Sequence, residues 1–468
     1  MKKILLILSV VLIVCFVGAN SIQLNADFYW QPEIPNDLQE VHFYDNSTGD
    51  IIAWIWYFGD GESSTLQNPL HIYPDDGEYT VRLVIIDSSG NTSYTEKNIT
   101  VLNVPPVADA GEDFISNSSQ VIFNGSASYD SDGFIVDYAW NFGDGGVAYG
   151  SIVAHIYIND GIYNVMLNVV DDDGENDNDT LNVTVDTTPP ETIYFLSEER
   201  EWYNEDVVVN LSASDNLTGV NKTYYKINDD DWQEYIENFT IIEEGIHEIN
   251  FYSKDVAGNR EEEKSFTLKI DHTLPETKYE IDATYGKDGW IKDKAVVTLN
   301  ASDNLSGIYK TYYKIDDDDW QEYENEFTFS VNGIHKIYFY SKDNAGNNEE
   351  EKNFTLKIDK KKPTVSLKLP EKGYIYIANR RIMPTLFGNT FIIGKFTAEA
   401  EADDTTSGVD YVEFILNGEI LWRDYVAPYR IELPQTFPIS CGNEIKVVAY
   451  DKAGNSEESE ILKYVKIF

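Results

Sequence analysis

The chain has 468 residues, a formal net charge of −46 at pH 7 and an aromatic content of 13%. An acidic balance of this size effectively excludes nucleic acid as a partner, because phosphate binding needs clustered Lys and Arg. The length predicts about three to five domains of ~100–200 residues each. The acidity itself is typical of a solvated, self-repelling surface that keeps a long chain soluble.

The N-terminus has the pattern of a secretory signal peptide. Basic residues 2–3 precede an apolar run over residues 4–17 and the small residues 18–19. The apolar run is shorter than the ~20 residues of a spanning helix, so an uncleaved membrane anchor is the weaker alternative. We therefore predict a signal peptide over residues 1–19 and a secreted or cell-surface protein that meets a membrane only if this segment stays uncleaved.

Cysteine and sequon usage agree with export. Without the leader, Cys441 is the only cysteine, so intrachain disulfides are excluded and each domain must rely on its apolar core. This favours a prokaryotic exported protein over a disulfide-built eukaryotic ectodomain. Fourteen Asn-x-Ser/Thr sequons, the last at Asn353, mark possible glycan sites, although Asn-rich turns also produce sequons by chance.

Short strands separated by turns are expected throughout the mature chain. Alternating runs at residues 79–85, 207–211 and 249–252 are bounded by Gly, Asp, Asn and Pro. Strands of this length with turn signals every ~8–12 residues are typical of antiparallel β-sandwiches. The fold class predicted is all-β, as a tandem array of about five immunoglobulin-like sandwiches.

Proline-containing breaks divide this array. Proline stiffens a joint and cannot occupy a central strand, and it follows a strand-ending Asp within a few residues at three places. The predicted domains are residues 20–103, 104–187, 188–275, 276–362 and 363–468.

The first two predicted domains share one set of motifs. Trp-x-Phe-Gly-Asp-Gly is followed by His-Ile-Tyr and Gly-x-Tyr-x-Val in both. These motifs begin at Trp56, His71 and Gly77 in the first domain and at Trp140, His155 and Gly161 in the second. The pattern resembles the polycystic-kidney-disease (PKD) domain, an immunoglobulin-like sandwich, over roughly residues 24–186.

The chemistry of these motifs favours structural roles. Large buried plugs are expected at Trp56 and Trp140, and Gly-Asp-Gly predicts a tight turn whose aspartate bonds local amides. The structural residues assigned in the two domains are Trp56, Asp60, Tyr79, Trp140, Asp144 and Tyr163, with Tyr79 and Tyr163 in tyrosine corners. A catalytic Asp–His pair is the alternative, and its presence in both copies counts against it.

The next two predicted domains contain a direct duplication. Residues 211–271 and 299–359 align without a gap, 88 positions apart, and 44 of the 61 positions are identical. A period this long makes each copy a whole small domain rather than a solenoid unit. The shared pattern, with Trp232 and Trp320 as structural residues and Asp-x-Ala-Gly-Asn near the end, resembles immunoglobulin-like repeats of bacterial and archaeal surface proteins.

Acidic turns in this pair offer calcium candidates. Carboxylate oxygens at such spacing suit calcium, although a solvated hairpin tip explains them equally. The candidates are Asp229, Asp231, Asp317 and Asp319. The loops at Asp215, Asp255, Asp303 and Asp343 offer further ligands if they converge. No other cofactor is predicted.

The last predicted domain resembles another bacterial-type immunoglobulin-like domain. Asn417-Gly418 between apolar runs predicts a hairpin turn. An insertion at residues 374–393 carries Arg380 and Arg381 among apolar residues. We expect a loop or extra strand packed on its own domain, with a docking surface as the alternative; this neighbourhood is similar to archaeal exported PKD and immunoglobulin-like arrays.

Motifs of hydrolases, metalloproteases and phosphate-binding enzymes are missing from the sequence. We therefore predict a non-catalytic extracellular protein, with no catalytic residues, that mediates adhesion by binding extracellular proteins or polysaccharides. The alternatives are a structural spacer or envelope component, and the accessory region of a secreted hydrolase system.

Overall fold

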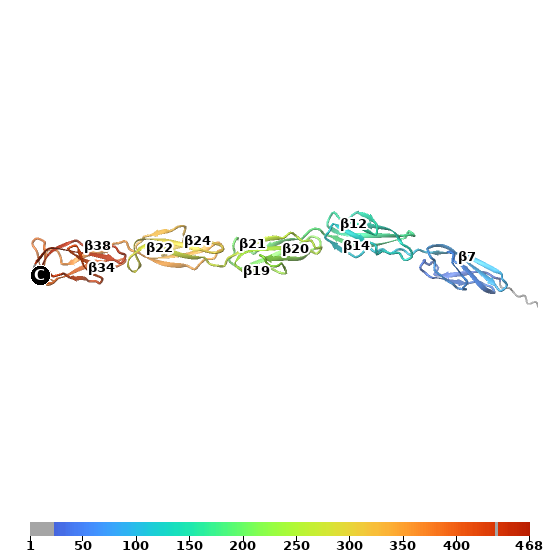
Figure 1. Ribbon diagram of the computed structural model, residues 1–468, viewed down its shortest axis with the longest axis horizontal. Helices are drawn as coiled ribbons and strands as arrows, with labels where there is room; N and C mark the ends of the chain where they lie inside the picture. The colour runs from blue at the N-terminus through green and yellow to red at the C-terminus, as the bar shows by residue number, and fades with distance from the viewer. Residues whose placement is uncertain (1–22, 436–438) are drawn as a thin grey trace, which may run out of the picture. The chain divides into compact units, whose positions relative to one another are not determined.

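The computed structural model describes residues 23–435 and 439–468, so the predicted signal peptide lies outside the described residues. Within these ranges the chain is almost entirely β-strand, with one 3-10 turn, η1 (Lys287–Gly289), as its helical element. No helix in the described part is long and apolar enough to cross a membrane. Contacts separate the chain into two units: residues up to Ile193 together with 212–224 and 251–263, and the remainder. The strands follow one another in five groups along the chain (Figure 1).

The first sandwich packs a three-stranded sheet, β1-β2-β5, against a four-stranded sheet, β4-β3-β6-β7. Its strands are β1 (Phe28–Gln31), β2 (Val41–Asp45), β3 (Ile51–Tyr57), β4 (Ser63–Ser64), β5 (Leu70–His71), β6 (Gly77–Asp87) and β7 (Thr92–Val101). The predicted alternating strand at residues 79–85 is confirmed, because it lies inside β6 with Val81, Leu83 and Ile85 fully buried.

The second sandwich has a five-stranded sheet, β11-β10-β13-β14-β8, and a two-stranded sheet, β12-β9. Its strands are β8 (Phe114–Ser116), β9 (Gln120–Asn124), β10 (Ile135–Asn141), β11 (Val147–Tyr149), β12 (Ile152–Ile156), β13 (Gly161–Asp171) and β14 (Asn176–Val185). Trp140 lies on the interior strand β10, as Trp56 lies on the interior strand β3 of the first sandwich.

The third group of strands forms the sheets β15-β16-β19 and β18-β17-β20-β21. Its strands are β15 (Glu191–Phe195), β16 (Val207–Ser214), β17 (Val220–Ile227), β18 (Gln233–Glu234), β19 (Phe239–Ile241), β20 (Gly245–Asp255) and β21 (Lys264–Ile270). The predicted strands at residues 207–211 and 249–252 are confirmed, because they lie within β16 and β20.

The fourth group repeats this order of strands, as the duplication predicts. Its strands are β22 (Glu276–Tyr285), β23 (Trp290–Ser302), β24 (Ile308–Ile315), β25 (Gln321–Glu322), β26 (Phe327–Phe329), β27 (Gly333–Asp343) and β28 (Lys352–Ile358). The sheet path β22-β23-β28-β27-β24-β25 is continuous because the long strand β23 pairs with both β22 and β28.

The fifth group contains the inserted segment. Its strands are β29 (Thr364–Leu369), β30 (Tyr374–Ile377), β31 (Arg380–Pro384), β32 (Thr390–Ile393), β33 (Thr397–Asp403), β34 (Val409–Leu416), β35 (Glu419–Asp424), β36 (Tyr429–Glu432), β37 (Ile439–Asp451), β38 (Ser456–Glu458) and β39 (Leu462–Ile467). The insertion adds β30, β31 and β32 to the sheet through β39, and Tyr376 and Ile392 are buried in the core. The expected packing on its own domain is therefore confirmed.

Separate apolar cores hold the sandwiches together. Four buried clusters are centred on Trp56, Trp140, Phe339 and Phe414, and each draws its residues from one strand group. The Asn417-Gly418 turn between β34 and β35 is also confirmed, with positive φ at both residues. The all-β tandem array of immunoglobulin-like sandwiches is thus the observed fold, while the predicted domain limits stay predictions.

Candidate metal centre

The Asp60–His71 pair of the first sandwich fixes a turn. His71 Nε2 lies 2.6 Å from Asp60 Oδ2, and the other carboxylate oxygen of Asp60 accepts the Glu62 N–H at 2.9 Å. The His71 ring stacks on Phe58 with 4.0 Å between centroids. Gly59 has a φ of +98°, and a Cβ there would lie 2.9 Å from the backbone N of Thr80. The Asp60 carboxylate, the His71 ring and Gly59 therefore each make a contact that packs or forms the turn.

The second sandwich reproduces this arrangement. His155 Nε2 lies 2.8 Å from Asp144 Oδ2, and Gly146 N donates to Asp144 Oδ1 at 2.8 Å. Burial opposes ionisation of Asp144, but the hydrogen bonds from His155 and Gly146 outweigh it and lower the pKa of the carboxyl. The carboxylate is therefore held in its charged form as a turn-forming acceptor.

The remaining structural residues anchor loops or faces. Trp56 and Trp140 are fully buried, and each indole N–H donates to a loop carbonyl. Tyr79 and Tyr163 donate from their hydroxyls to backbone carbonyls four residues upstream, in the manner of a tyrosine corner. In the duplicated pair, Trp232 and Trp320 lie at the surface, with Trp232 half-buried and Trp320 36% exposed.

Lysine side chains cover these surface tryptophans. Lys226 Nζ lies 5.2 Å from the centre of the Trp232 ring, and Lys314 Nζ lies 4.9 Å from that of Trp320. Such a cation–π contact stabilises an exposed ring by about 0.5–1 kcal/mol. Trp232 and Trp320 therefore lie in a different environment from the core tryptophans Trp56 and Trp140.

The predicted calcium turns are exposed hairpin tips. Asp229, Asp231, Asp317 and Asp319 are all solvent-exposed turn residues. Within the described residues, none of the four belongs to a group of three or more converging acidic, histidine or cysteine ligands. Calcium at these tips stays a prediction.

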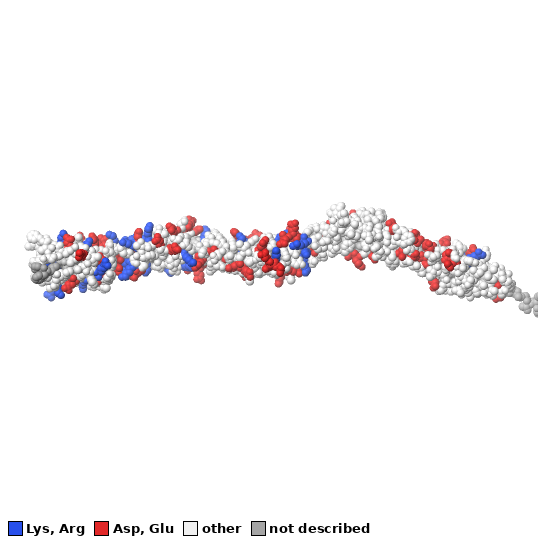
Figure 2. Space-filling model, in the orientation of Figure 1, with Lys and Arg blue, Asp and Glu red and all other residues white. Residues whose placement is uncertain are grey.

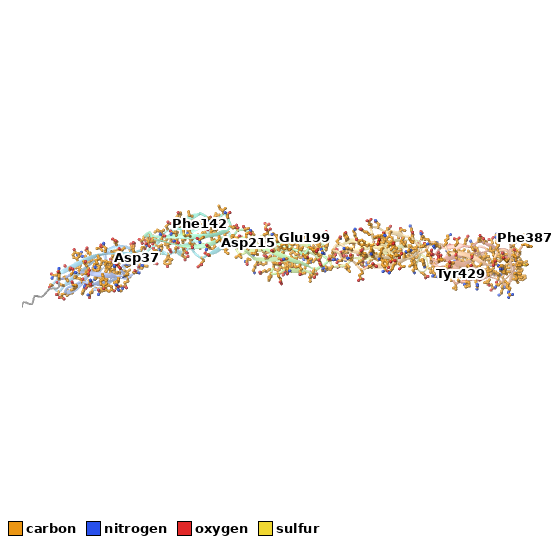
Figure 3. All side chains as sticks on the ribbon, turned by 180° about the vertical axis from the view of Figure 1, so that it is seen from behind. Asp37, Phe142, Glu199, Asp215, Phe387 and Tyr429 are labelled. Carbon is orange, nitrogen blue, oxygen red and sulfur yellow. The ribbon has the colours of Figure 1, made fainter. Side chains whose placement is uncertain are left out.

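A carboxylate cluster that sequence reasoning missed lies where the first strand group leads into the second. Asp37, at one end of the first sandwich, is only 5% exposed (Figure 3). The Asp37 N–H donates to Leu102 O at 3.3 Å, which places Asp37 beside the end of β7. Two residues further along, the Val104 N–H donates to Asp132 Oδ2 at 2.9 Å. These bonds bring Asp37 and Asp132 to the same joint.

Several buried oxygens in this region have no hydrogen-bond partner. They belong to the Asn36, Asp37, Asn103, Asp130 and Asp132 side chains, and both oxygens of Asp130 are among them. Buried polar atoms are almost always hydrogen-bonded in folded proteins. Carboxylate and amide oxygens are the ligands that a hard divalent cation such as calcium prefers, although Asp37, Asp130 and Asp132 are not among the groups of the described residues whose oxygens all lie within 4.8 Å of one another.

The electrostatics of the cluster agree with this chemistry. Burial, together with the hydrogen bond and charge of Asp132, raises the pKa of Asp37 to about 6. Burial and Asp132 also raise the pKa of Asp130. Carboxyls that repel each other in this way are stabilised as anions by a cation between them. The only sequence signal for the site was Asp130-Ser131-Asp132, because Asn36 and Asp37 belong to no recognisable motif.

Successive immunoglobulin-like sandwiches define the class of this protein, a tandem array of β-sandwich domains. The PKD domain family model matches residues 35–101 and 103–185, so the first two sandwiches are PKD domains. The resemblance stated from the Trp-x-Phe-Gly-Asp-Gly motifs is therefore confirmed for this part of the chain.

Curated relatives match a limited part of the chain. Pre-pro-metalloprotease PrtV of Vibrio cholerae is 33% identical over 129 residues, which is 28% of this chain and 14% of PrtV. Collagenase ColA of Bacillus cereus is 37% identical over 79 residues, covering 16% of this chain and 8% of ColA. The crystal structure of the PKD1 domain from Vibrio cholerae PrtV is 26% identical and covers 17% of this chain and 95% of that domain, with a TM-score of 0.16. The chain thus spans a small fraction of these relatives' length.

Proposed function

We propose that this chain is a non-catalytic, exported multidomain protein that mediates adhesion by binding extracellular proteins or glycans. The observation that carries the proposal is an exposed apolar face on the second sandwich. A face of this kind on an acidic protein marks an interaction site more readily than a scattered apolar residue does.

The apolar face lies on the two-stranded sheet of β9 and β12. Register places Ala154 opposite Ile122, with Ile152 and Ile156 two residues to either side of Ala154 on β12. The three isoleucine side chains are 61–68% exposed, whereas Val121, Phe123 and Val153 on the alternate positions are buried. Residues 98–199 contain no Lys or Arg but many Asp and Glu, few of which lie on the face of the second sandwich that Figure 2 shows. Apolar contact, rather than ion pairing, would therefore dominate binding here.

A retention experiment tests this proposal. Mature protein is incubated with cell-wall polysaccharides, a glycan panel and intact cells, and we expect retention on at least one of them. The double variant Ile122→Thr with Ile156→Thr keeps β-branched side chains but removes apolar surface, so its retention falls at least about tenfold. Ile162→Thr, at an equally exposed isoleucine on β13, is the matched control. Absence of retention of the parent protein contradicts adhesion and favours the spacer.

We also propose that the Asp37 joint holds a calcium ion. Asp132, which contacts both Asp37 and Asp130, would share the ion with these two residues, and the ion would draw the three carboxylates closer together than they lie in this structure. Asp37→Asn and Asp130→Asn should each weaken calcium binding measured by titration calorimetry. A melting curve of the parent protein that is insensitive to both chelator and added calcium contradicts the site.

The relatives favour one alternative function. Because PrtV and ColA are named as a metalloprotease and a collagenase, this chain would serve as the accessory region of a secreted hydrolase system. In that case the mature protein binds collagen or another polymer substrate without cleaving it. Measurable turnover of any polymer by the purified chain contradicts the non-catalytic assignment itself.

A further inference from the structure

Nine aspartates outside the Asp37 joint form three clusters of one design. In each cluster, oxygens of three carboxylates lie within 4.8 Å of one another. The clusters are Asp186, Asp215 and Asp255; Asp271, Asp303 and Asp343; and Asp359, Asp404 and Asp451. The sequence did not show whether the loops at Asp215 and Asp255, or those at Asp303 and Asp343, converge. In the structure each of these two pairs does converge, and a third aspartate joins it.

Each cluster is assembled from the same three places in the fold. The first aspartate directly follows the last strand of one group, as Asp271 follows β21. The second directly follows an early strand of the next group, as Asp303 follows β23. The third ends a long central strand, as Asp343 ends β27. Asp215, from the corresponding loop of the first cluster, lies at an end of the third sandwich (Figure 3).

Backbone and amide donors hold the carboxylates in place. In the third cluster, the Ser407 N–H contacts Asp359 Oδ2 at 3.0 Å and Asp404 Oδ1 at 2.8 Å. Asn455 Nδ2 donates to Asp451 Oδ2 at 2.9 Å and to the Asp359 carbonyl at 2.8 Å. Neutral donors therefore position all three carboxylates without neutralising their charge.

Each cluster places the negative charges of its carboxylates close together and away from solvent, with no cation beside them in the described residues. The first and third aspartates of every cluster are at most 2% exposed. Among the ion pairs of the described residues, none involves any of the nine carboxylates. Burying three adjacent anions without a cation costs several kcal/mol, so such groups are normally paired, protonated or metal-bound.

Buried oxygens without partners provide an independent sign of a missing ligand. Asp303 Oδ2, in the second cluster, is buried and accepts no hydrogen bond. In the third cluster, the Ser407 hydroxyl has no partner although the residue is only 6% exposed. At the corresponding position of the first cluster, the Thr218 hydroxyl lies 2.5 Å from Asp186 Oδ2, whereas in the second cluster the Ser306 hydroxyl oxygen accepts the Ala345 N–H at 3.3 Å. These oxygen atoms are suitable ligands for a cation that prefers oxygen, such as calcium.

We infer that each of the three aspartate clusters is a calcium site that ties the end of one strand group to two loops of the next. Calcium accepts six to eight oxygens in irregular geometry, whereas magnesium demands a near-ideal octahedron and retains its water. Three carboxylates with a neighbouring hydroxyl and solvent on the open side suit the larger ion. The inference is independent of adhesion and of the Asp37 joint, because it uses other residues.

Asp303→Asn is the sharpest test. Asp303 Oδ1 accepts the Leu305 N–H at 3.1 Å and the Gly307 N–H at 2.8 Å, and an asparagine carbonyl keeps both bonds. The substitution therefore changes only the unpartnered oxygen and the charge. Asp293→Asn, at an exposed position of β23 in the same strand group and outside every candidate calcium site, is the matched control.

Calcium stoichiometry of the full mature chain, measured by equilibrium dialysis with radioactive calcium, is the readout. We expect Asp303→Asn to bind about one ion fewer than the parent, or to bind that ion at least about tenfold more weakly, and Asp293→Asn to match the parent. Unchanged stoichiometry and affinity in Asp303→Asn overturn the inference for this cluster. Asp404→Asn gives the same test in the third cluster, where Asp404 Oδ1 takes all the backbone donors.

Circular dichroism in chelator separates a lost site from a lost fold. Both asparagine variants should retain the β-sheet spectrum of the chelated parent. If one of the two variants loses this spectrum, the calcium binding of the other variant tests the inference. Calcium binding equal to that of the parent in either folded variant counts against the inference. The adhesion assay and the Asp37→Asn variant report on different residues, so their failure is distinguishable from failure here.

Discussion

Removing one buried hydroxyl should destabilise the fourth sandwich measurably. Ser341 is fully buried on β27, and its Oγ lies 2.6 Å from Thr277 Oγ1 and 2.7 Å from Thr311 Oγ1. The Ser341 N–H donates to Glu349 Oε1 at 2.8 Å, and Glu349 also bonds Thr277. Ser341→Ala leaves this backbone bond intact but deprives the buried Thr311 hydroxyl of its partner.

The expected cost follows from that unsatisfied hydroxyl. A buried polar group without a partner costs about 1–3 kcal/mol, so we expect a loss of about 2 kcal/mol. Because unfolding of a multidomain chain is not two-state, hydrogen exchange resolved by segment is the appropriate assay. Amides of β27 and β28 that exchange by unfolding of this sandwich should exchange about 30-fold faster, since 1.4 kcal/mol corresponds to tenfold.

A double variant gives the refuting result. Ser341→Ala with Thr311→Val removes both partners, so it should lose less protection than Ser341→Ala alone. An equal or larger loss in the double variant would refute the argument from an unsatisfied hydroxyl. The third strand group provides a replicate, because Ser253 Oγ lies 2.6 Å from Thr192 Oγ1 and 2.7 Å from Thr223 Oγ1.

Three further predictions concern turns and titration. Gly143→Ala should destabilise the second sandwich by more than about 2 kcal/mol, because its Cβ would lie 2.6 Å from Asn164 O. Gly145→Ala meets open space and costs only positive-φ strain of about 1 kcal/mol, and segment-resolved hydrogen exchange in β13 and β14 compares the two variants. Tyr163→Phe removes the 2.7 Å bond to a loop carbonyl and should cost about 1 kcal/mol by the same measurement. Burial raises the pKa of Tyr464 to about 12, so this tyrosine ionises in the unfolded chain before it ionises in the folded protein. The free energy of unfolding should therefore fall by up to about 3 kcal/mol between pH 10 and pH 12. Thermal melts should show a smaller loss over this pH range in Tyr464→Phe.

Much of the fold was readable from local patterns. The Trp-x-Phe-Gly-Asp-Gly motif combines a core residue with a turn that needs glycine, so it indicates both a strand and its end. Gly59 and Gly143 do have positive φ, and Trp56 and Trp140 are buried. Alternation and turn chemistry depend on neighbours in sequence, which explains why this level of structure was predictable.

The candidate metal sites were harder to predict because they depend on convergence. Asp215 and Asp255 are 40 positions apart and carry no shared motif, yet their carboxylates meet Asp186 at one strand end. Asp37 likewise meets Asp132 only because the chain around Leu102 passes beside it. By contrast, the run around Asp317 attracts attention through composition alone, while the structure leaves it solvated.

The acidic residues of this chain have two different roles, depending on where they lie. Surface carboxylates account for a soluble, repelling exterior, but those at strand ends are buried and close together, so repulsion there acts directly on the connections between strand groups. Removal of calcium should therefore loosen the loops around Ser407 and Asn455 while leaving exchange in the cores unchanged. A cation requirement confined to the joints lets the same sandwich be repeated without redesign of its core, because each new copy brings two loop aspartates and the strand before it supplies the third.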